Sequence, residues 1–381
     1  MRIALIAKLF APVSSLSTGG TETFVYNLAK VLSCKGHQVT VFASGDSEIG
    51  GKVKVIPVTK ISFWQKYVDN PKIFEQFSES RKAASEESIG YIKTLYYLKE
   101  HIDDFDLIHD NSLYFLPLIL HQELVKLPLV ATLHVPIDKF KTPEIIDDLN
   151  IKEKINNYYI AISENQKKQV TNLDIFDINY NGIDADRFGF CDKSENYLLW
   201  IGRIVPEKGL EKAIEVAIKV NMPLKIIGSI ADESYFNDKI KNKIEQHENI
   251  EYLGEKSGQE IVELYQKAKI FLFPIDWEEP FGLVLTEAMA CGTPVVAFNR
   301  GAVSEIIQDK VTGFICPPND VGSMISSVER INKMTDSEYM AMRRACCNHV
   351  MENFTLQKMV EGYEKIYQRV IDDWKKKEEN G

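Results

Sequence analysis

The sequence has 381 residues, of which 45% are hydrophobic and 26% charged, with a formal net charge of −10. This length favours two globular domains, because one hydrophobic core rarely extends beyond about 250–300 residues. The acidic balance argues against partners that need a basic surface, such as nucleic acid or an anionic membrane. The six scattered cysteines lack metal-ligand spacing and indicate reduced thiols. We therefore expect a soluble, cytoplasmic protein.

Apolar and amphipathic runs alternate along the chain, which is typical of α/β folds with parallel sheets. In the first half we predict strands at 2–7, 39–43, 107–109, 129–133 and 158–162. A glycine-containing loop and an amphipathic helix over about 21–32 follow the first strand. These elements predict one doubly wound, Rossmann-like domain over residues 1–182.

The segment 60–105 interrupts this rhythm with aromatic and charged residues. The favoured interpretation is an ordinary helical insertion that covers the sheet. An acceptor-site wall and a membrane-surface patch are the alternatives, and the acidic total charge disfavours the second.

A second series of the same kind begins near residue 197. Here we predict a helix at 209–220 and strands at 197–201, 224–227, 250–253, 270–273 and 294–298. They form a second Rossmann-like domain over 183–355, and a final helix over about 356–381 is expected to pack back on the first domain. Two such domains predict a ligand cleft at the carboxyl ends of their sheets.

The most informative segment is 277–292, which reads WEEPFGLVLTEAMACG. Proline and glycine followed by helix formers describe a strand–loop–helix unit. The helix start would leave three amides unpaired toward an anionic or hydroxyl-rich ligand: those of Phe281, Gly282 and Leu283. Glu279 in the loop and Glu287 in the helix can each accept hydrogen bonds from sugar hydroxyls. Surface and dipole-complementing roles explain the two carboxylates equally well when the segment is considered alone.

Glu279 and Glu287, with seven residues between them, resemble the E-x7-E motif of retaining glycosyltransferases of the GT-B fold. The fuller likeness is to glycosyltransferase family 4, and it covers nearly the whole chain. The resemblance implies that Glu279 holds hydroxyls of the transferred sugar and Glu287 the ribose hydroxyls of the nucleotide. The amides of 281–283 would then contact the sugar and the diphosphate.

Arg203 and Lys208 flank a strand end that opens into a helix, a position that suits a diphosphate. They resemble the family's Arg–Lys pair, which would neutralise the leaving diphosphate in place of a metal ion. We therefore expect neither a metal nor a cofactor. Asp184 and Asp186 have the spacing of a metal-binding pair, but they follow an Asn-Gly turn, which favours turn and cap chemistry.

In the first domain, Gly19 and Gly20 resemble the family's N-terminal glycine loop, whose amides approach the diphosphate, and Gly20 is the stronger candidate. His134 ends a strand where the family places a histidine, and it can steady the sugar or an acceptor hydroxyl. His109 and Asn111 end the preceding strand. For these two, an acceptor-side role and a structural role remain equally open.

One departure from the family concerns the nucleotide base. After strand 224–227 the family commonly has glycine, any residue, glycine, whereas this chain has Gly228-Ser229-Ile230. The donor is therefore open between uridine and guanosine diphosphate sugars, with uridine favoured.

The expected function is retaining transfer of a hexose-type sugar from a nucleotide-sugar donor to a hydroxyl acceptor. A nucleotide-sugar epimerase on the same fold and a non-catalytic nucleotide- or glycan-binding protein are the alternatives. The intact set of Arg203, Lys208, Glu279 and Glu287 disfavours the binding protein.

Overall fold

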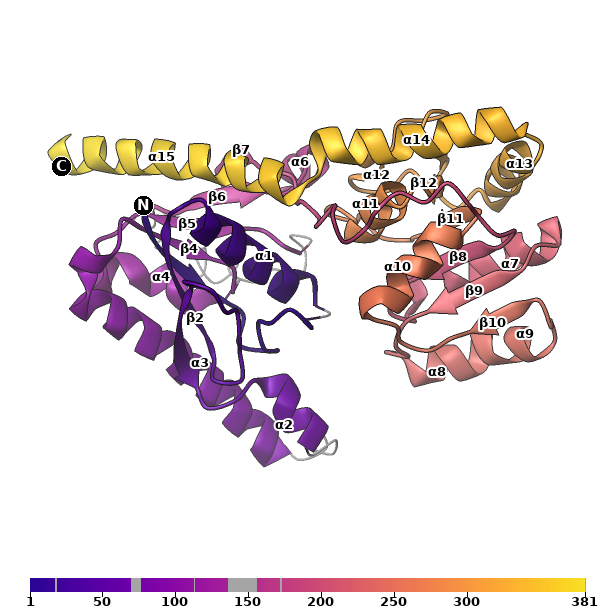
Figure 1. Cartoon of the computed structure of the whole chain (residues 1–381). Helices are drawn as coiled ribbons and strands as arrows, with labels where there is room; N and C mark the ends of the chain where they lie inside the picture. The colour runs from indigo at the N-terminus through magenta and orange to yellow at the C-terminus, as the bar shows by residue number, and fades with distance from the viewer. Residues whose placement is uncertain (18, 70–76, 113, 136–155, 172, 381) are drawn as a thin grey trace. The chain divides into compact units, whose positions relative to one another are not determined.

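The computed structural model describes residues 1–17, 19–69, 77–112, 114–135, 156–171 and 173–380, and Figure 1 shows the chain. The chain divides into two compact units. Unit 1 comprises Met1–Tyr180 with Leu356–Gly381, and unit 2 comprises Asn181–Thr355. The division falls two residues before the predicted boundary, and the C-terminal helix belongs to unit 1.

Unit 1 is built on a seven-stranded parallel sheet in the order β3-β2-β1-β4-β5-β6-β7. The strands are β1 (Arg2–Ile6), β2 (Gln38–Ser44), β3 (Lys54–Thr59), β4 (Leu107–Asp110), β5 (Leu129–Thr132), β6 (Tyr158–Ala161) and β7 (Ile175–Ile178). The chain starts in an inner strand, winds outward to β3 and then adds strands on the other side. This is the predicted doubly wound topology. The sequence did not predict β3 and β7, which are the two edge strands.

Helices cover both faces of this sheet because successive strand residues point to opposite sides. The helices are α1 (Gly20–Cys34), α2 (Phe63–Asp69), α3 (Phe77–Glu100), α4 (Phe115–Leu124), α6 (Glu164–Gln169) and α15 (Leu356–Asn380), with a 3-10 helix at Ile102–Asp104. Ile3 and Leu5 share one core cluster with α1 and α15, whereas Ala4 and Ile6 share another with α3 and α4. The segment 60–105 thus contains helices, and α3 covers the sheet, as the favoured interpretation expected.

A buried hydrogen-bond network holds α15 in unit 1. The two ring nitrogens of His109 lie 2.6 Å from the Tyr367 hydroxyl and 2.7 Å from Thr132 Oγ1, which lies 2.8 Å from the Tyr363 hydroxyl. All four side chains are fully buried, and burial lowers the pKa of His109 well below its usual range. Of the two roles left open for His109, these contacts favour the structural one, because both nitrogens of this neutral ring are occupied inside the core.

Unit 2 is built on a six-stranded parallel sheet in the order β10-β9-β8-β11-β12-β13. The strands are β8 (Leu198–Ile201), β9 (Leu224–Ile227), β10 (Ile250–Tyr252), β11 (Ile270–Phe273), β12 (Val295–Phe298) and β13 (Gly313–Cys316). The main helices are α7 (Leu210–Val220), α10 (Gly258–Lys267), α11 (Leu283–Ala290), α13 (Val321–Asn332) and α14 (Asp336–Asn353). Short helical segments are the 3-10 turn at Pro206–Lys208, α8 (Glu233–Tyr235), the π turn at Phe236–Ile240, α9 (Lys241–Glu245) and α12 (Val303–Ile306). Within the described ranges, neither unit has a helix with the length and apolar character needed to cross a membrane.

A buried arginine ties the helices of unit 2 together. Arg343 of α14 has no exposed surface, and its guanidinium donates to the carbonyls of Cys191 at 2.6 Å and Gln266 at 3.0 Å. It also donates to the Tyr339 hydroxyl at 3.2 Å. These acceptors lie before β8, in α10 and in α14, so one side chain fixes three segments of the unit.

Candidate active site

The predicted carboxylate motif lies where β11 ends and α11 begins. β11 is fully buried, and Phe281 anchors the connecting loop in the core with only 2% of its surface exposed. Gly282 adopts φ +90° directly before the helix, a conformation that glycine tolerates without steric cost. The amides of Gly282 and Leu283 have no hydrogen-bond partner within the described part of the chain. The positive end of α11 is therefore available to an anionic or hydroxyl group.

Glu279 forms the centre of a three-residue cluster with Lys208 and Trp277. Its Oε2 accepts hydrogen bonds from Lys208 Nζ at 2.9 Å and from Trp277 Nε1 at 2.9 Å. Lys208 Nζ also lies 4.3 Å from the centre of the indole ring, which adds a cation–π contact. The Lys208 and Glu279 side chains are only 17% and 13% exposed. Two residues 71 positions apart, predicted from separate motifs, are thus in direct contact.

Two glycines allow the backbone to approach closely enough for this contact. A Cβ on Gly209, where φ is +68°, would lie 1.8 Å from the carbonyl oxygen of Pro274. A Cβ on Gly301, where φ is +59°, would lie 2.1 Å from the carbonyl oxygen of Glu279. That oxygen accepts a hydrogen bond from the amide of Ala302 at 2.9 Å. Sequence reasoning assigned no role to Trp277, although this residue lies in the segment 277–292 that it had identified.

Arg203 follows β8 with an exposed side chain. No described residue forms a hydrogen bond or ion pair with its guanidinium. Nearby, the backbones at Gly202 and Gly228 cross so closely that a Cβ on Gly228 would lie 1.8 Å from the Gly202 carbonyl oxygen. The Ser229 carbonyl accepts from the amide of Ile204 at 2.8 Å. The segment 228–230, in which Ile230 stands where the family commonly has its second glycine, is therefore hydrogen-bonded to the loop that carries Arg203.

Glu287 lies in the second turn of α11 and is held by a tyrosine. The Tyr265 hydroxyl donates to Glu287 Oε2 at 2.9 Å. Burial raises the pKa of the Glu287 carboxyl, while the Tyr265 hydrogen bond and the charge of Arg187 act against that rise. Glu279 and Glu287 thus differ in setting, since the first contacts a cation and the second a neutral hydroxyl.

In unit 1, Gly19 caps α1 and Gly20 is the first residue of the helix. The carboxylate of Glu22 lies over this loop, because a Cβ on Gly19 would lie 2.2 Å from Glu22 Oε2. Glu22 is 6% exposed, and burial raises the pKa of its carboxyl. Sequence reasoning missed Glu22, although its position in the first helical turn beside a Gly-Gly pair was a usable signal.

His134 follows β5, and Asn111 fixes its orientation. His134 Nε2 lies 3.0 Å from Asn111 Oδ1, while Asn111 Nδ2 donates to the His109 carbonyl. The amide oxygen therefore faces the ring, so Nε2 carries the proton. The Phe24 ring packs edge-on at 4.5 Å, and burial, with a smaller contribution from the charge of Lys8, lowers the pKa of His134 to about 3. Asn111 is fully buried and orients His134, which favours the structural role of the two left open for it.

Comparison with known proteins relates these features to a family. Residues 18–187 match the model described as Glycosyltransferase Family 4, and residues 184–346 match the model of Glycosyl transferases group 1. The two matches overlap at residues 184–187, and together they include the glycine loop, His134 and the E-x7-E segment. The chain belongs to the family 4, group 1 glycosyltransferases.

This glycosyltransferase is 26% identical over 370 residues to an uncharacterized glycosyltransferase of Methanocaldococcus jannaschii, covering 87% of this chain and 89% of that protein. It is 23% identical over 399 residues to the O-antigen chain mannosyltransferase C of Escherichia coli, covering 98% of this chain and 99% of that protein. The crystal structure of Anabaena HepE in complex with UDP and glucose matches with a TM-score of 0.70 at 18% identity, covering 97% of this chain and 100% of that chain. The structural likeness establishes the GT-B fold.

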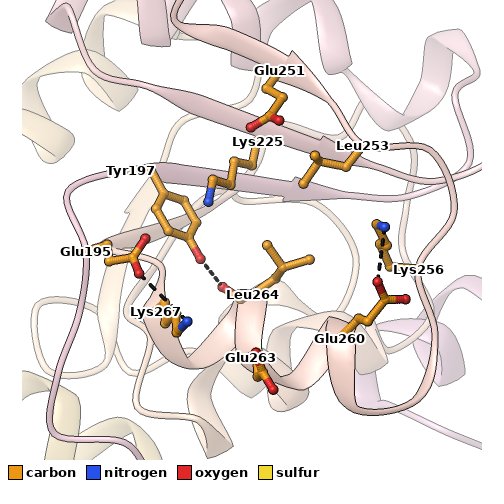
Figure 2. A pocket seen from close by; sticks show the side chains of 10 residues that line it. All are labelled: Glu195, Tyr197, Lys225, Glu251, Leu253, Lys256, Glu260, Glu263, Leu264 and Lys267. Carbon is orange, nitrogen blue, oxygen red and sulfur yellow. Dashed lines mark hydrogen bonds and ion pairs between the residues drawn. The ribbon is translucent and has the colours of Figure 1, made fainter.

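Unit 2 of this glycosyltransferase has a further pocket of about 310 Å³ beside α10 (Figure 2). Four glutamates and three lysines line it, among other residues. Lys256 pairs with Glu260 at 3.2 Å and Lys267 with Glu195 at 3.9 Å. None of the predicted site residues lines this pocket, and its paired charges offset one another, so we assign it no part in sugar transfer.

Proposed function

We propose that this glycosyltransferase moves a hexose-type sugar from a UDP-sugar to a hydroxyl acceptor, with retention of anomeric configuration and without a metal ion. The observation that carries the proposal is the Lys208–Glu279 pair beside the free amides at the start of α11. A cation, a carboxylate and helix amides that lie together can bind a diphosphate and a sugar. UDP is favoured because HepE, which shares the fold, was solved with UDP and glucose. A GDP-sugar is the alternative donor.

In the proposed reaction, the bond between the sugar C1 and the diphosphate oxygen breaks while the acceptor oxygen bonds to C1 on the same face. The acceptor proton passes to the departing diphosphate oxygen. Lys208, Arg203 and the amides of Gly282 and Leu283 stabilise the negative charge that develops on the diphosphate. These fixed cations and dipoles supply the stabilisation that a metal ion provides in other transferases.

Glu279 acts in this proposal as a binding group. Its Oε2 accepts from both Lys208 and Trp277, and no described residue bonds to its Oε1. Oε1 can therefore accept a hydrogen bond from a hydroxyl of the transferred sugar. Glu287 accepts hydrogen bonds from the ribose.

For unit 1, we propose that the Gly19–Gly20 loop approaches the diphosphate and that His134 steadies a sugar or acceptor hydroxyl. His134 is neutral near pH 7 because burial lowers its pKa. With Nε2–H donating to Asn111, its Nδ1 has a lone pair for a hydroxyl proton. A neutral ring suits this role, since it adds no charge that would attract the donor phosphate away from Lys208.

The direct test is product analysis with UDP-sugars and a panel of hydroxyl acceptors, with and without EDTA. We expect NMR of the product to show the anomeric configuration of the donor, at a rate that EDTA does not change. An inverted product, or loss of activity with EDTA, would contradict the proposal. A new UDP-sugar formed without acceptor would favour the epimerase, and nucleotide binding without any turnover would favour the binding protein.

Glu279→Ala provides a second arm of this test. Removing one positioned transition-state group commonly costs about 10²–10³ in rate. We therefore expect transfer to fall by about that factor while the affinity for UDP changes only a few-fold. Loss of UDP binding with normal turnover at saturation would overturn the assignment of Glu279 to the sugar.

A further inference from the structure

Glu287, the carboxylate that the proposed function assigns to the ribose, is held by Tyr265, a residue to which the proposed function gives no role. Tyr265 lies in α10 and has no exposed surface. Its hydroxyl donates to Glu287 Oε2 at 2.9 Å. This contact joins α10 to α11 across 22 positions of the sequence.

Tyr265 is held through its backbone and through its ring. Thr293, just after α11, donates through Oγ1 to the Tyr265 carbonyl at 2.5 Å. The phenol ring packs edge-on against Phe188 with centroids 6.1 Å apart and lies 5.8 Å from the Phe271 ring. Because core residues hold the ring, the hydroxyl cannot follow a rotation of the carboxylate.

The hydrogen bond leaves the two carboxylate oxygens of Glu287 in different states. Oε2 accepts from Tyr265, whereas Oε1 has no hydrogen-bond partner within the part of the chain that the structure describes. A carboxylate fixed through one oxygen presents the lone pairs of the other in a defined direction. A preoriented acceptor binds a hydroxyl without the entropy cost of ordering it.

We propose that Tyr265 is a positioning residue that aims Glu287 at the ribose and so sets the preference of the donor site for ribonucleotides over deoxyribonucleotides. This inference rests on the proposed function, in which Glu287 binds the ribose hydroxyls. Without the Tyr265 hydroxyl, the half-buried carboxylate of Glu287 loses the donor that stabilises its charged form and its fixed orientation. Its hydrogen bonds to ribose hydroxyls then weaken, while contacts to the base and the diphosphate remain.

The test compares Tyr265→Phe with a matched control, Tyr197→Phe. The Tyr197 hydroxyl donates to the Leu264 carbonyl at 2.7 Å, so the control also removes one phenol hydrogen bond to α10 (Figure 2). It leaves Glu287 untouched. Isothermal titration calorimetry gives the affinities of each variant for UDP, 2′-deoxy-UDP and 3′-deoxy-UDP, with the GDP series run in parallel.

We expect the wild type and Tyr197→Phe to prefer the ribonucleotide by about tenfold or more, as hydrogen bonds to charged groups typically contribute. In Tyr265→Phe the preference should fall below about threefold, because the affinity for UDP falls more than the affinity for either deoxynucleotide, each of which keeps only one ribose hydroxyl. Glu287→Ala should abolish the preference, and adding Tyr265→Phe to it should have no further effect, because the tyrosine acts through the carboxylate.

Two results would overturn the inference alone. The first is a Tyr265→Phe variant that keeps the full preference while Glu287→Ala loses it. The second is an equal loss of affinity for ribo- and deoxynucleotides, which would indicate general damage to unit 2. A wild type that binds neither nucleotide series, or a silent Glu287→Ala, would overturn the proposed function and this inference with it.

Discussion

The contact between Lys208 and Glu279 makes a quantitative prediction about stability. Their atoms lie 2.9 Å apart and most of each side chain is buried. With an effective dielectric constant of about 20, the Coulomb attraction at this distance is about 6 kcal/mol, of which desolvation offsets a large part. Exposed ion pairs contribute about 0.2–1 kcal/mol. We therefore expect a net coupling of about 2 kcal/mol between the two side chains.

Urea denaturation of a double-mutant cycle measures this coupling. Lys208→Met should lower the free energy of unfolding by about 3 kcal/mol, because it leaves the carboxylate with Trp277 as its remaining partner. Once Glu279→Gln is present, the same change should cost only about 1 kcal/mol, since no buried charge is left unpaired. The exposed pair of Lys256 and Glu260, at 3.2 Å, is the control and should couple by about 0.5 kcal/mol. Additive effects of Lys208→Met and Glu279→Gln would refute the reasoning.

Three further predictions concern the stability of the fold. Gly301→Ala should lower the free energy of unfolding by about 3 kcal/mol and impair transfer, because the added Cβ would collide with the Glu279 backbone. The control is Gly50→Ala, where φ is +75° and the added Cβ meets open space; urea denaturation should show a loss of only about 1 kcal/mol. Burial lowers the pKa of His121 from 6.5 to about 4, so the folded state binds fewer protons than the unfolded state between these values. Relative to His121→Leu, the free energy of unfolding of the wild type should therefore fall by about 1.4 kcal/mol per pH unit between pH 6.5 and pH 4, and should not change above pH 6.5. The same pH dependence of stability in both proteins would contradict this. Arg343→Met should lower the free energy of unfolding by at least about 3 kcal/mol, measured by thermal or urea denaturation, because it leaves buried carbonyls without donors. A loss below about 1 kcal/mol would show that these hydrogen bonds contribute little to stability.

The inner strands were predictable because both faces of a parallel sheet are buried, so their sequences are mostly apolar. β11 was predicted to the residue for this reason. β3 was missed because Lys54 and Pro57 interrupt its apolar pattern, which an edge strand tolerates. β7 carries Asp177 and is half-buried throughout, so its pattern also differs from that of an inner strand.

Local motifs identified the residues of the candidate site, but long-range contacts determine their settings. The E-x7-E spacing pointed to Glu279 and Glu287 without indicating that Lys208 contacts the first and Tyr265 the second. The role of His109 depends on Tyr367, which lies 258 positions away in a helix that returns to unit 1. No pattern of spacing in the sequence encodes such a contact.

The most direct test of the central claim is isothermal titration of UDP into the wild type and into an Arg203→Met/Lys208→Met variant. If these cations bind the diphosphate, the wild type binds UDP and the variant binds it at least about a hundredfold more weakly, since charge-assisted hydrogen bonds typically contribute about 1.5–3 kcal/mol each. Equal affinities in the two proteins would contradict the account, as would a wild type that does not bind UDP.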